Sequence, residues 1–439
     1  MVELTPYGLT FVAVAAVLIV LLPRRSAAVP LMVGVCYIAL GQGIQVGPFH
    51  FFVIRILILA GLLRALVRNE RPIGGGTRLD WLMLWWGGGA VVASAFRADP
   101  GATVVFNLGL AFNALGIYFL LRVFLTCQED AVWLCRVVVI MLVPVALEMA
   151  LEHATESNLF ALFGGVTEYP AIRNGRLRAQ GPFAHAILAG TVGAVCLPLA
   201  IALWGKYRHT ALAGIIACVS MVFTSASSGP LLSAMGTVLA LVLWPWRTHM
   251  RVFRRLIVGA YLVLDLVMKA PPYYLLARID LAGGSTGWHR AALIESAIGH
   301  LSEWWLAGTD YTRHWMPTGV SWSPNHTDIT NYYLQLGVDG GLPLMLLFIA
   351  MLVVGFRTVG DVVAGDSQRE GSRGFFAWAL GASLFGHTAT GISVSYFDQS
   401  FAFVYLTLAA IATVSGAKED NRRDAGRRIG ADETGRLTP

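Results

Sequence analysis

A short polar stretch, residues 324–332, holds the residue types best suited to chemistry in this chain. It reads Pro-Asn-His-Thr-Asp-Ile-Thr-Asn-Tyr and leads directly into a long apolar run. His326 can act as a general base near neutral pH, and Asp328 can orient it or act in its place. Asn331 and Tyr332 can hydrogen-bond hydroxyl or phosphate oxygens. The same polar residues can also cap the next helix, so a catalytic and a structural role both stay open.

A second candidate stretch is rich in arginine. Arg173, Arg176 and Arg178 lie close together in the chain, and His185 follows them. The guanidinium group offers a planar fork of donors that matches phosphate oxygens. We interpret this stretch as a phosphate or pyrophosphate clamp, with ordinary contact of a surface loop with lipid headgroups as the alternative.

A third group of candidates follows a glycine-rich turn in an aromatic-rich loop. The pattern predicts a helix from Trp288 to Leu306, with a buried stripe at Ala291, Ile294, Ile298, Leu301 and Trp305. Trp288 and His289 are candidates for substrate contact, because aromatic faces suit sugar C–H surfaces. Arg290 lies at the border of the stripe, where its head can reach a pocket at the membrane surface. The predicted solvated face carries His289, Ser296, His300 and Glu303.

Composition places these candidates in a membrane protein. The chain has 439 residues, of which 56% are hydrophobic and 13% charged, and its mean hydropathy is +0.64. Soluble domains carry roughly 25% charged residues. About thirteen apolar runs have the character of membrane spans, near residues 7–22, 29–47, 50–66, 80–96, 102–122, 131–151, 182–203, 210–226, 229–246, 254–269, 332–356, 374–392 and 399–416. The count is twelve if the first run is not a true span, so the prediction is an all-α polytopic membrane protein with 12–13 transmembrane helices.

The distribution of basic residues predicts the orientation. Lys and Arg gather in alternate loops, which the positive-inside rule assigns to the cytoplasm. Two long connections, about 152–181 and 270–331, then face outside and carry the candidates above. We predict a single transmembrane domain over residues 1–416 and a disordered cytoplasmic tail over 417–439. The net charge of +6 reflects this sidedness, and we predict contact with the lipid bilayer and no nucleic-acid partner.

Other residues extend or limit the predicted site. Arg55 lies near the external end of its span without a local partner, so it is a candidate for the same anion site. The stretch Thr224–Gly229 is interpreted as a tight polar turn that can also line the site. The five cysteines lie in or beside apolar runs, and no His, Cys or carboxylate cluster has metal-ligand spacing. Walker A and Rossmann patterns are absent, so we predict no metal and no cofactor.

Four motifs together resemble the O-antigen ligase and O-antigen polymerase family of bacterial inner-membrane glycosyltransferases. They are Arg178-Ala-Gln-Gly-Pro-Phe-Ala-His-Ala-Ile, Thr224-Ser-Ala-Ser-Ser-Gly-Pro, Gly287-Trp-His-Arg-Ala-Ala-Leu with Trp305-Leu-Ala-Gly-Thr, and Asn331-Tyr-Tyr-Leu-Gln-Leu-Gly-Val-Asp-Gly-Gly-Leu-Pro-Leu. Their order and predicted sidedness carry the resemblance, which spreads over about residues 30–410.

The resemblance implies a GT-C type bundle and a metal-independent, inverting transfer on the periplasmic face. The donor would be a glycan linked to undecaprenyl pyrophosphate, and the acceptor either lipid A-core, for a ligase, or another glycan, for a polymerase. Arg178 and Arg290 map best to the pyrophosphate-binding arginines. Thr330 stands where the family has a histidine, so His326 and Asp328 are the candidate bases. A transporter of lipid-linked saccharides is the competing function, but it would place charges midway through broken spans.

Overall fold

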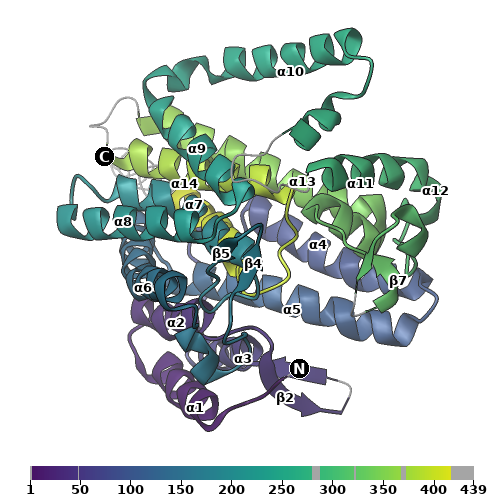
Figure 1. Ribbon diagram of the computed structural model, residues 1–439. Helices are drawn as coiled ribbons and strands as arrows, with labels where there is room; N and C mark the ends of the chain where they lie inside the picture. The colour runs from purple at the N-terminus through teal and green to yellow at the C-terminus, as the bar shows by residue number, and fades with distance from the viewer. Residues whose placement is uncertain (1, 48, 279–286, 321–322, 367–371, 417–439) are drawn as a thin grey trace, which may run out of the picture.

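The computed structural model describes residues 2–47, 49–278, 287–320, 323–366 and 372–416, so the predicted tail 417–439 lies outside the described residues. The helices in chain order are α1 (Pro6–Leu21), α2 (Ala28–Tyr37), α3 (Val53–Val67), α4 (Arg78–Ala93), α5 (Pro100–Phe124), α6 (Gln128–Thr155), α7 (Ala186–Ala202), α8 (Arg208–Thr224), α9 (Ser228–Val242), α10 (Met250–Val267), α11 (Gly287–Gly299), α12 (Leu301–Trp304), α13 (Tyr332–Asp366), α14 (Ser372–Gly391) and a last helix, Phe401–Gly416 (Figure 1).

Short elements connect these helices. Strands are β1 (Val2–Glu3), β2 (Gln42–Val46), β3 (Phe49–Phe52), β4 (Ala171–Arg173), β5 (Arg176–Arg178), β6 (Gly319–Val320) and β7 (Ser323–Thr327). They form three small sheets, with the orders β1-β2-β3, β4-β5 and β6-β7. The 3₁₀ turns are η1 (Arg25–Ala27), η2 (Ser94–Phe96), η3 (Leu159–Phe163), η4 (Trp244–His249), η5 (Pro272–Arg278) and η6 (Arg313–Trp315).

Each predicted apolar run overlaps a helix, but the lengths vary. Among the residues that the structure describes, four helical stretches are long and apolar enough to cross a membrane: Arg78–Phe96, Pro100–Phe124, Gln128–Thr155 and Tyr332–Asp366. A fifth candidate is the pair Ser228–Val242 and Trp244–Val267, which is bent by 79°. Other apolar helices have only 10–17 residues, short of the roughly 20 that a span needs. The architecture is therefore compatible with an all-α membrane protein, with four to five such helices rather than the 12–13 predicted.

The prediction of a single membrane-spanning helix over residues 29–47 is wrong. The run 29–47 was expected to be a single helix, but α2 ends at Tyr37 and residues 42–46 form strand β2. Glycines explain the break: a Cβ at Gly43 would lie 2.5 Å from the Phe51 carbonyl oxygen, so the two strands approach too closely for a side chain. Gly47 turns the chain with φ +60.

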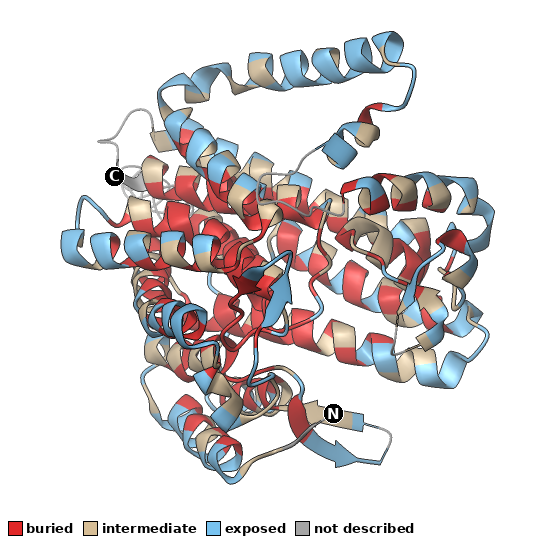
Figure 2. Cartoon of the chain, viewed as in Figure 1, coloured by how far each residue is buried: buried red, intermediate tan, exposed pale blue. Residues whose placement is uncertain are grey.

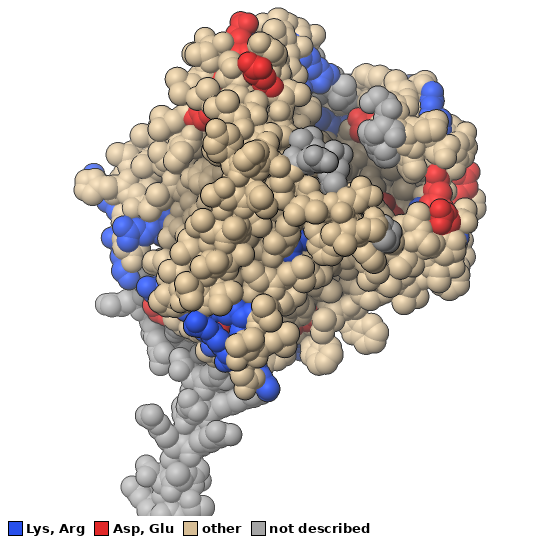
Figure 3. All heavy atoms as spheres, turned by 90° about the horizontal axis from the view of Figure 1, so that it is seen from below, with Lys and Arg blue, Asp and Glu red and all other residues tan. Residues whose placement is uncertain are grey.

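The helices enclose a continuous apolar core that reaches from Val12 on α1 to Val414 on the last helix. Burial in Figure 2 concentrates in the middle of the bundle, whereas α10 has no buried residue along its length. Most of the face seen in Figure 3 carries no charged side chain, and Lys and Arg gather mainly toward its left and lower edges. A broad uncharged surface of this kind suits contact with lipid.

A break inside α13 docks the long connection between α10 and α13 onto the bundle. Gly341 has φ +78, and a Cβ there would lie 2.3 Å from the Leu306 carbonyl oxygen. Arg97, at the end of η2, donates from Nη1 to the Val338 carbonyl at 2.6 Å. It also pairs through Nη2 with Asp310 at 2.6 Å. The side chain of Arg97 is 6% exposed and that of Asp310 is 38% exposed, so a half-buried ion pair holds the connection in place.

Candidate anion-binding site

The predicted arginine clamp starts on a tight hairpin. Strands β4 and β5 pair antiparallel, and Asn174 and Gly175 both have positive φ, as an Asn-Gly turn of type I′ requires. Arg178 at the end of β5 is only 8% exposed. Its Nη2 donates to Ser227 Oγ at 2.6 Å, so the turn between α8 and α9 lines the site. Its buried Nε has no hydrogen-bond partner among the described residues.

A second arginine, from the long connection, lies within electrostatic reach of the hairpin. Arg290 on α11 is half-buried and donates from Nε to the Ser393 carbonyl at 3.1 Å. Burial lowers the pKa of Arg178, and the charges of Arg173 and Arg290 lower it further. Burial and the charge of Arg173 likewise lower the pKa of Arg290, while Asp328 opposes this shift. Three like charges from two distant segments thus lie within electrostatic reach of one another.

His185 completes the cluster. Its Nδ1 accepts a hydrogen bond from the Ile187 N–H at 3.1 Å and so caps α7. A neutral ring with an accepting Nδ1 carries its proton on Nε2, which makes that atom a donor. Burial lowers the pKa of His185 to about 4, with added contributions from Arg178 and Arg173. The ring is therefore neutral at pH 7 and can donate to an anion without adding to the repulsion.

The polar stretch before α13 divides between two places. Asp328 is exposed and is the carboxylate that acts electrostatically on Arg290. His326 lies instead near Asp310 and Arg97, and its Nδ1 is 2.7 Å from Ser323 Oγ. Burial and Arg97 lower the pKa of His326, and Asp310 opposes them. The structure therefore brings Asp328, and not His326, to the arginine cluster.

Two predicted substrate contacts have structural roles. Asn331 Oδ1 accepts from the Leu334 N–H at 3.1 Å, so Asn331 is the residue of the polar stretch that caps α13. Its Nδ2 donates to the Ile392 carbonyl at 3.0 Å. Tyr332 is 5% exposed and packs edge-on against Phe348 and Tyr396 in the core.

The predicted helix 288–306 is broken in two, and its buried face differs from the predicted one. It divides into α11 and α12. Ala291 of the predicted stripe is buried, but Ile298, Leu301 and Trp305 are exposed. Leu293, Ala297 and Trp304 are buried in their place, and so is His289, which was predicted on the solvated face. His289 Nε2 lies 3.0 Å from the Asp328 carbonyl oxygen and holds that strand end against α11. Trp288 is 55% exposed, where a sugar ring can reach it.

Two further predicted arginines have other surroundings. Arg55 was expected to lack a local partner, but its Nε donates to Asn113 at 3.0 Å and its Nη1 to the His50 carbonyl at 2.6 Å. These partners come from α5 and β3, which sequence spacing alone does not bring together. Arg176 lies at the start of β5, opposite Arg173 in the hairpin register, and is exposed.

Residues that the sequence analysis did not select hold the arginine segment in position. Glu152 Oε2, buried on α6, accepts from the Gln180 and Gly181 N–H groups at 3.0 and 2.8 Å. Asp398 Oδ2 accepts from the Ala184 N–H at 2.9 Å. These carboxylates satisfy backbone groups between Arg178 and His185, so they act as positioning residues. The one signal that marks Glu152 in the sequence is its carboxylate directly after the apolar run 131–151.

His185 predicts a specific pH dependence of stability. Its pKa is about 4 in the folded chain, against about 6.5 in an unfolded one. The unfolded state therefore binds the extra proton, and the free energy of unfolding should fall as pH drops from about 6.5 toward 4. His185→Asn keeps a capping side chain but cannot titrate. Denaturant unfolding in detergent should show a shallower acid loss in the variant, and equal pH dependence in both proteins would contradict the assignment.

A comparison of the chain with models of known protein families finds no match, and a comparison with curated proteins finds none either. The functional argument therefore rests on the residues and their arrangement.

Proposed function

We propose that this chain is a membrane glycosyltransferase that moves a glycan from undecaprenyl pyrophosphate to a saccharide hydroxyl. The observation that carries the proposal is the convergence of Arg173, Arg178 and Arg290, with neutral His185 beside them. Clustered like charges disfavour the ligand-free state, and a pyrophosphate would relieve that repulsion through charge-assisted hydrogen bonds. The unpartnered Arg178 Nε offers one such donor.

The chemistry follows from the same arrangement. The acceptor hydroxyl oxygen attacks the anomeric carbon, the bond from that carbon to the phosphate oxygen breaks, and the configuration inverts. The hydroxyl proton passes to a base, and the electron pair leaves with the pyrophosphate. Preorganised arginine donors would stabilise the charge that develops on the leaving group. No step uses a metal.

Asp328 is our candidate for the base. It is exposed beside Arg290, whereas His326 lies near Arg97. Thr330 stands where the resembled family has a histidine, and a neutral hydroxyl is a poor base at pH 7. Its Oγ1 is buried without a hydrogen-bond partner among the described residues.

The finer fold and location are part of this proposal. The order of helices and the basic loops support a GT-C type bundle in the bacterial inner membrane, with its active site on the periplasmic face. We propose ligation to lipid A-core as the activity, with polymerisation of O-antigen or exopolysaccharide as the alternative within the same chemistry.

Purified protein tests the proposal with an undecaprenyl-pyrophosphate oligosaccharide, with and without lipid A-core. We expect a single transfer that requires the core, with release of undecaprenyl pyrophosphate. Ladders of product without the core would indicate a polymerase instead. Movement of the donor across proteoliposomes with no bond cleavage would indicate a transporter and would overturn the enzyme proposal.

A further inference from the structure

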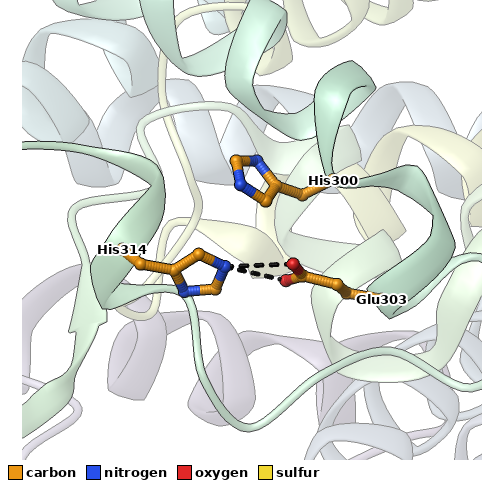
Figure 4. Close-up of side chains that lie close together, drawn as sticks. All are labelled: His300, Glu303 and His314. Carbon is orange, nitrogen blue, oxygen red and sulfur yellow. Dashed lines mark hydrogen bonds and ion pairs between the residues drawn. The ribbon is translucent and has the colours of Figure 1, made fainter.

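A cluster of potential metal ligands lies in the long connection, formed by different residues from the arginine site. His300 lies between α11 and α12, Glu303 lies on α12, and His314 belongs to η6. One ligand atom from each of these residues lies within 4.8 Å of the others. Figure 4 shows the three side chains from these two segments gathered around one point, with His314 and Glu303 facing each other.

Hydrogen bonds orient the ligand atoms. His300 Nδ1 lies 2.8 Å from the Ser296 carbonyl oxygen, to which it must donate, so the Nε2 lone pair of the neutral ring is available. Metal-binding histidines usually donate a hydrogen bond from their other ring nitrogen, often to a backbone carbonyl. Trp315 Nε1 donates to Glu303 Oε2 at 3.1 Å and fixes the carboxylate.

Ring stacking holds both imidazoles. The ring of His300 stacks on Trp315 at 5.8 Å with an interplanar angle of 18°. The ring of His314 stacks on Tyr311 at 4.9 Å and 13°. Both rings are therefore held in place beside the Glu303 carboxylate.

A simple ion pair explains only part of this arrangement. His314 Nε2 lies 3.0 Å from Glu303 Oε2, with side chains 34% and 36% exposed, and an exposed pair of this kind contributes little to stability. It does not account for the third ligand or its oriented Nε2. In a tetrahedral zinc site the ligand atoms lie about 3.4 Å apart. Small side-chain rotations of exposed groups would close the present spacing to that value.

We propose that His300, Glu303 and His314 bind a zinc ion, with water at the fourth position, and that this ion ties α12 to η6. His300 and His314 would each bind through Nε2, and Glu303 through its carboxylate. Nε2 of His314 must first lose the proton that it shares with Glu303, so binding releases one proton to solvent for each chain in which that nitrogen is protonated. The site is structural and takes no part in glycan transfer.

Zinc titration of the full chain in detergent tests this inference, after removal of metal with a chelator and desalting. We expect one zinc per chain by elemental analysis and calorimetry, and a higher melting temperature with zinc present. His300→Ala, His314→Ala and Glu303→Gln should each weaken binding by at least about tenfold. His153→Ala, which removes an exposed histidine on α6, is the matched control and should leave zinc binding unchanged.

Glu303→Gln distinguishes a metal site from a cluster that only forms hydrogen bonds between α12 and η6. The amide oxygen can still accept from Trp315 and His314, so the variant should fold with an unchanged melting temperature in the absence of zinc. Its melting temperature should then rise only at zinc concentrations at least about tenfold higher than the wild type requires. A wild-type chain that takes up no zinc, or a glutamine variant that binds zinc as tightly as the wild type, would overturn the inference.

Discussion

Replacing Arg178 with alanine is expected to lower the turnover of glycan transfer by on the order of 10²–10³-fold, the usual cost of one preorganised donor. Its guanidinium is buried, is held by Ser227, and keeps a buried Nε without a partner among the described residues. Arg290→Ala should have a similar effect from the opposite side of the site. Turnover at saturating lipid-linked donor measures both.

Controls separate this loss from misfolding. Arg178 and Arg290 repel each other and Arg173 in the ligand-free chain. Removal of one charge should therefore leave the melting temperature nearly unchanged. Arg176→Ala alters the same hairpin at an exposed position and should change turnover by less than about fivefold, the range of an exposed interaction. Wild-type turnover in both Arg178→Ala and Arg290→Ala would exclude the pyrophosphate clamp.

A lysine at position 178 tests whether the charge or the planar shape of the arginine matters. Arg178→Lys keeps the charge but loses the planar fork that binds two phosphate oxygens. It should restore part of the turnover, and inorganic pyrophosphate should inhibit it less strongly than the wild type. If Arg178→Lys had the same turnover as the wild type, the charge alone, and not the bidentate geometry, would set the rate.

The sequence predicted the helices well because each apolar run is a local signal. It also selected Arg173, Arg178 and Arg290, because arginines are unexpected in connections that the positive-inside rule predicts to be external. The prediction of one helix over 29–47 was wrong, because the close approach of Gly43 to the Phe51 backbone favours the β2–β3 hairpin despite the hydrophobicity of the run. The predicted buried stripe of α11 was right at Ala291 and wrong at Ile298, because tertiary packing buries Leu293 and Ala297 instead.

Long-range contacts explain most of what the sequence could not reveal. Glu152 and Asp398 are far apart in the chain, yet both hold the segment between Arg178 and His185. No local periodicity pairs them. His314 likewise meets His300 and Glu303 only because η6 folds back onto α12. The sequence analysis therefore did not select this cluster.

Asp328→Asn is expected to slow transfer by about 10²–10⁴-fold, the contribution of a positioned general base. Asparagine keeps the size of the side chain and cannot accept the hydroxyl proton. His326→Asn should change turnover far less, because His326 lies near Asp310 and Arg97 and bonds to Ser323. Initial rates with saturating donor and acceptor compare the two variants directly. The opposite ranking would move the base to His326.

Asp328→Asn is also expected to change the affinity for pyrophosphate. Asp328 is the negative charge that acts on Arg290, so its neutralisation leaves the arginine cluster more positive. Binding of pyrophosphate should then become tighter while the chemical step becomes slower. A merely structural role for Asp328 would weaken binding and turnover together, because the strand end that His289 holds would shift. Inhibition constants for inorganic pyrophosphate, measured beside turnover, therefore distinguish a base from a structural residue, and unchanged turnover in Asp328→Asn would remove it from the mechanism.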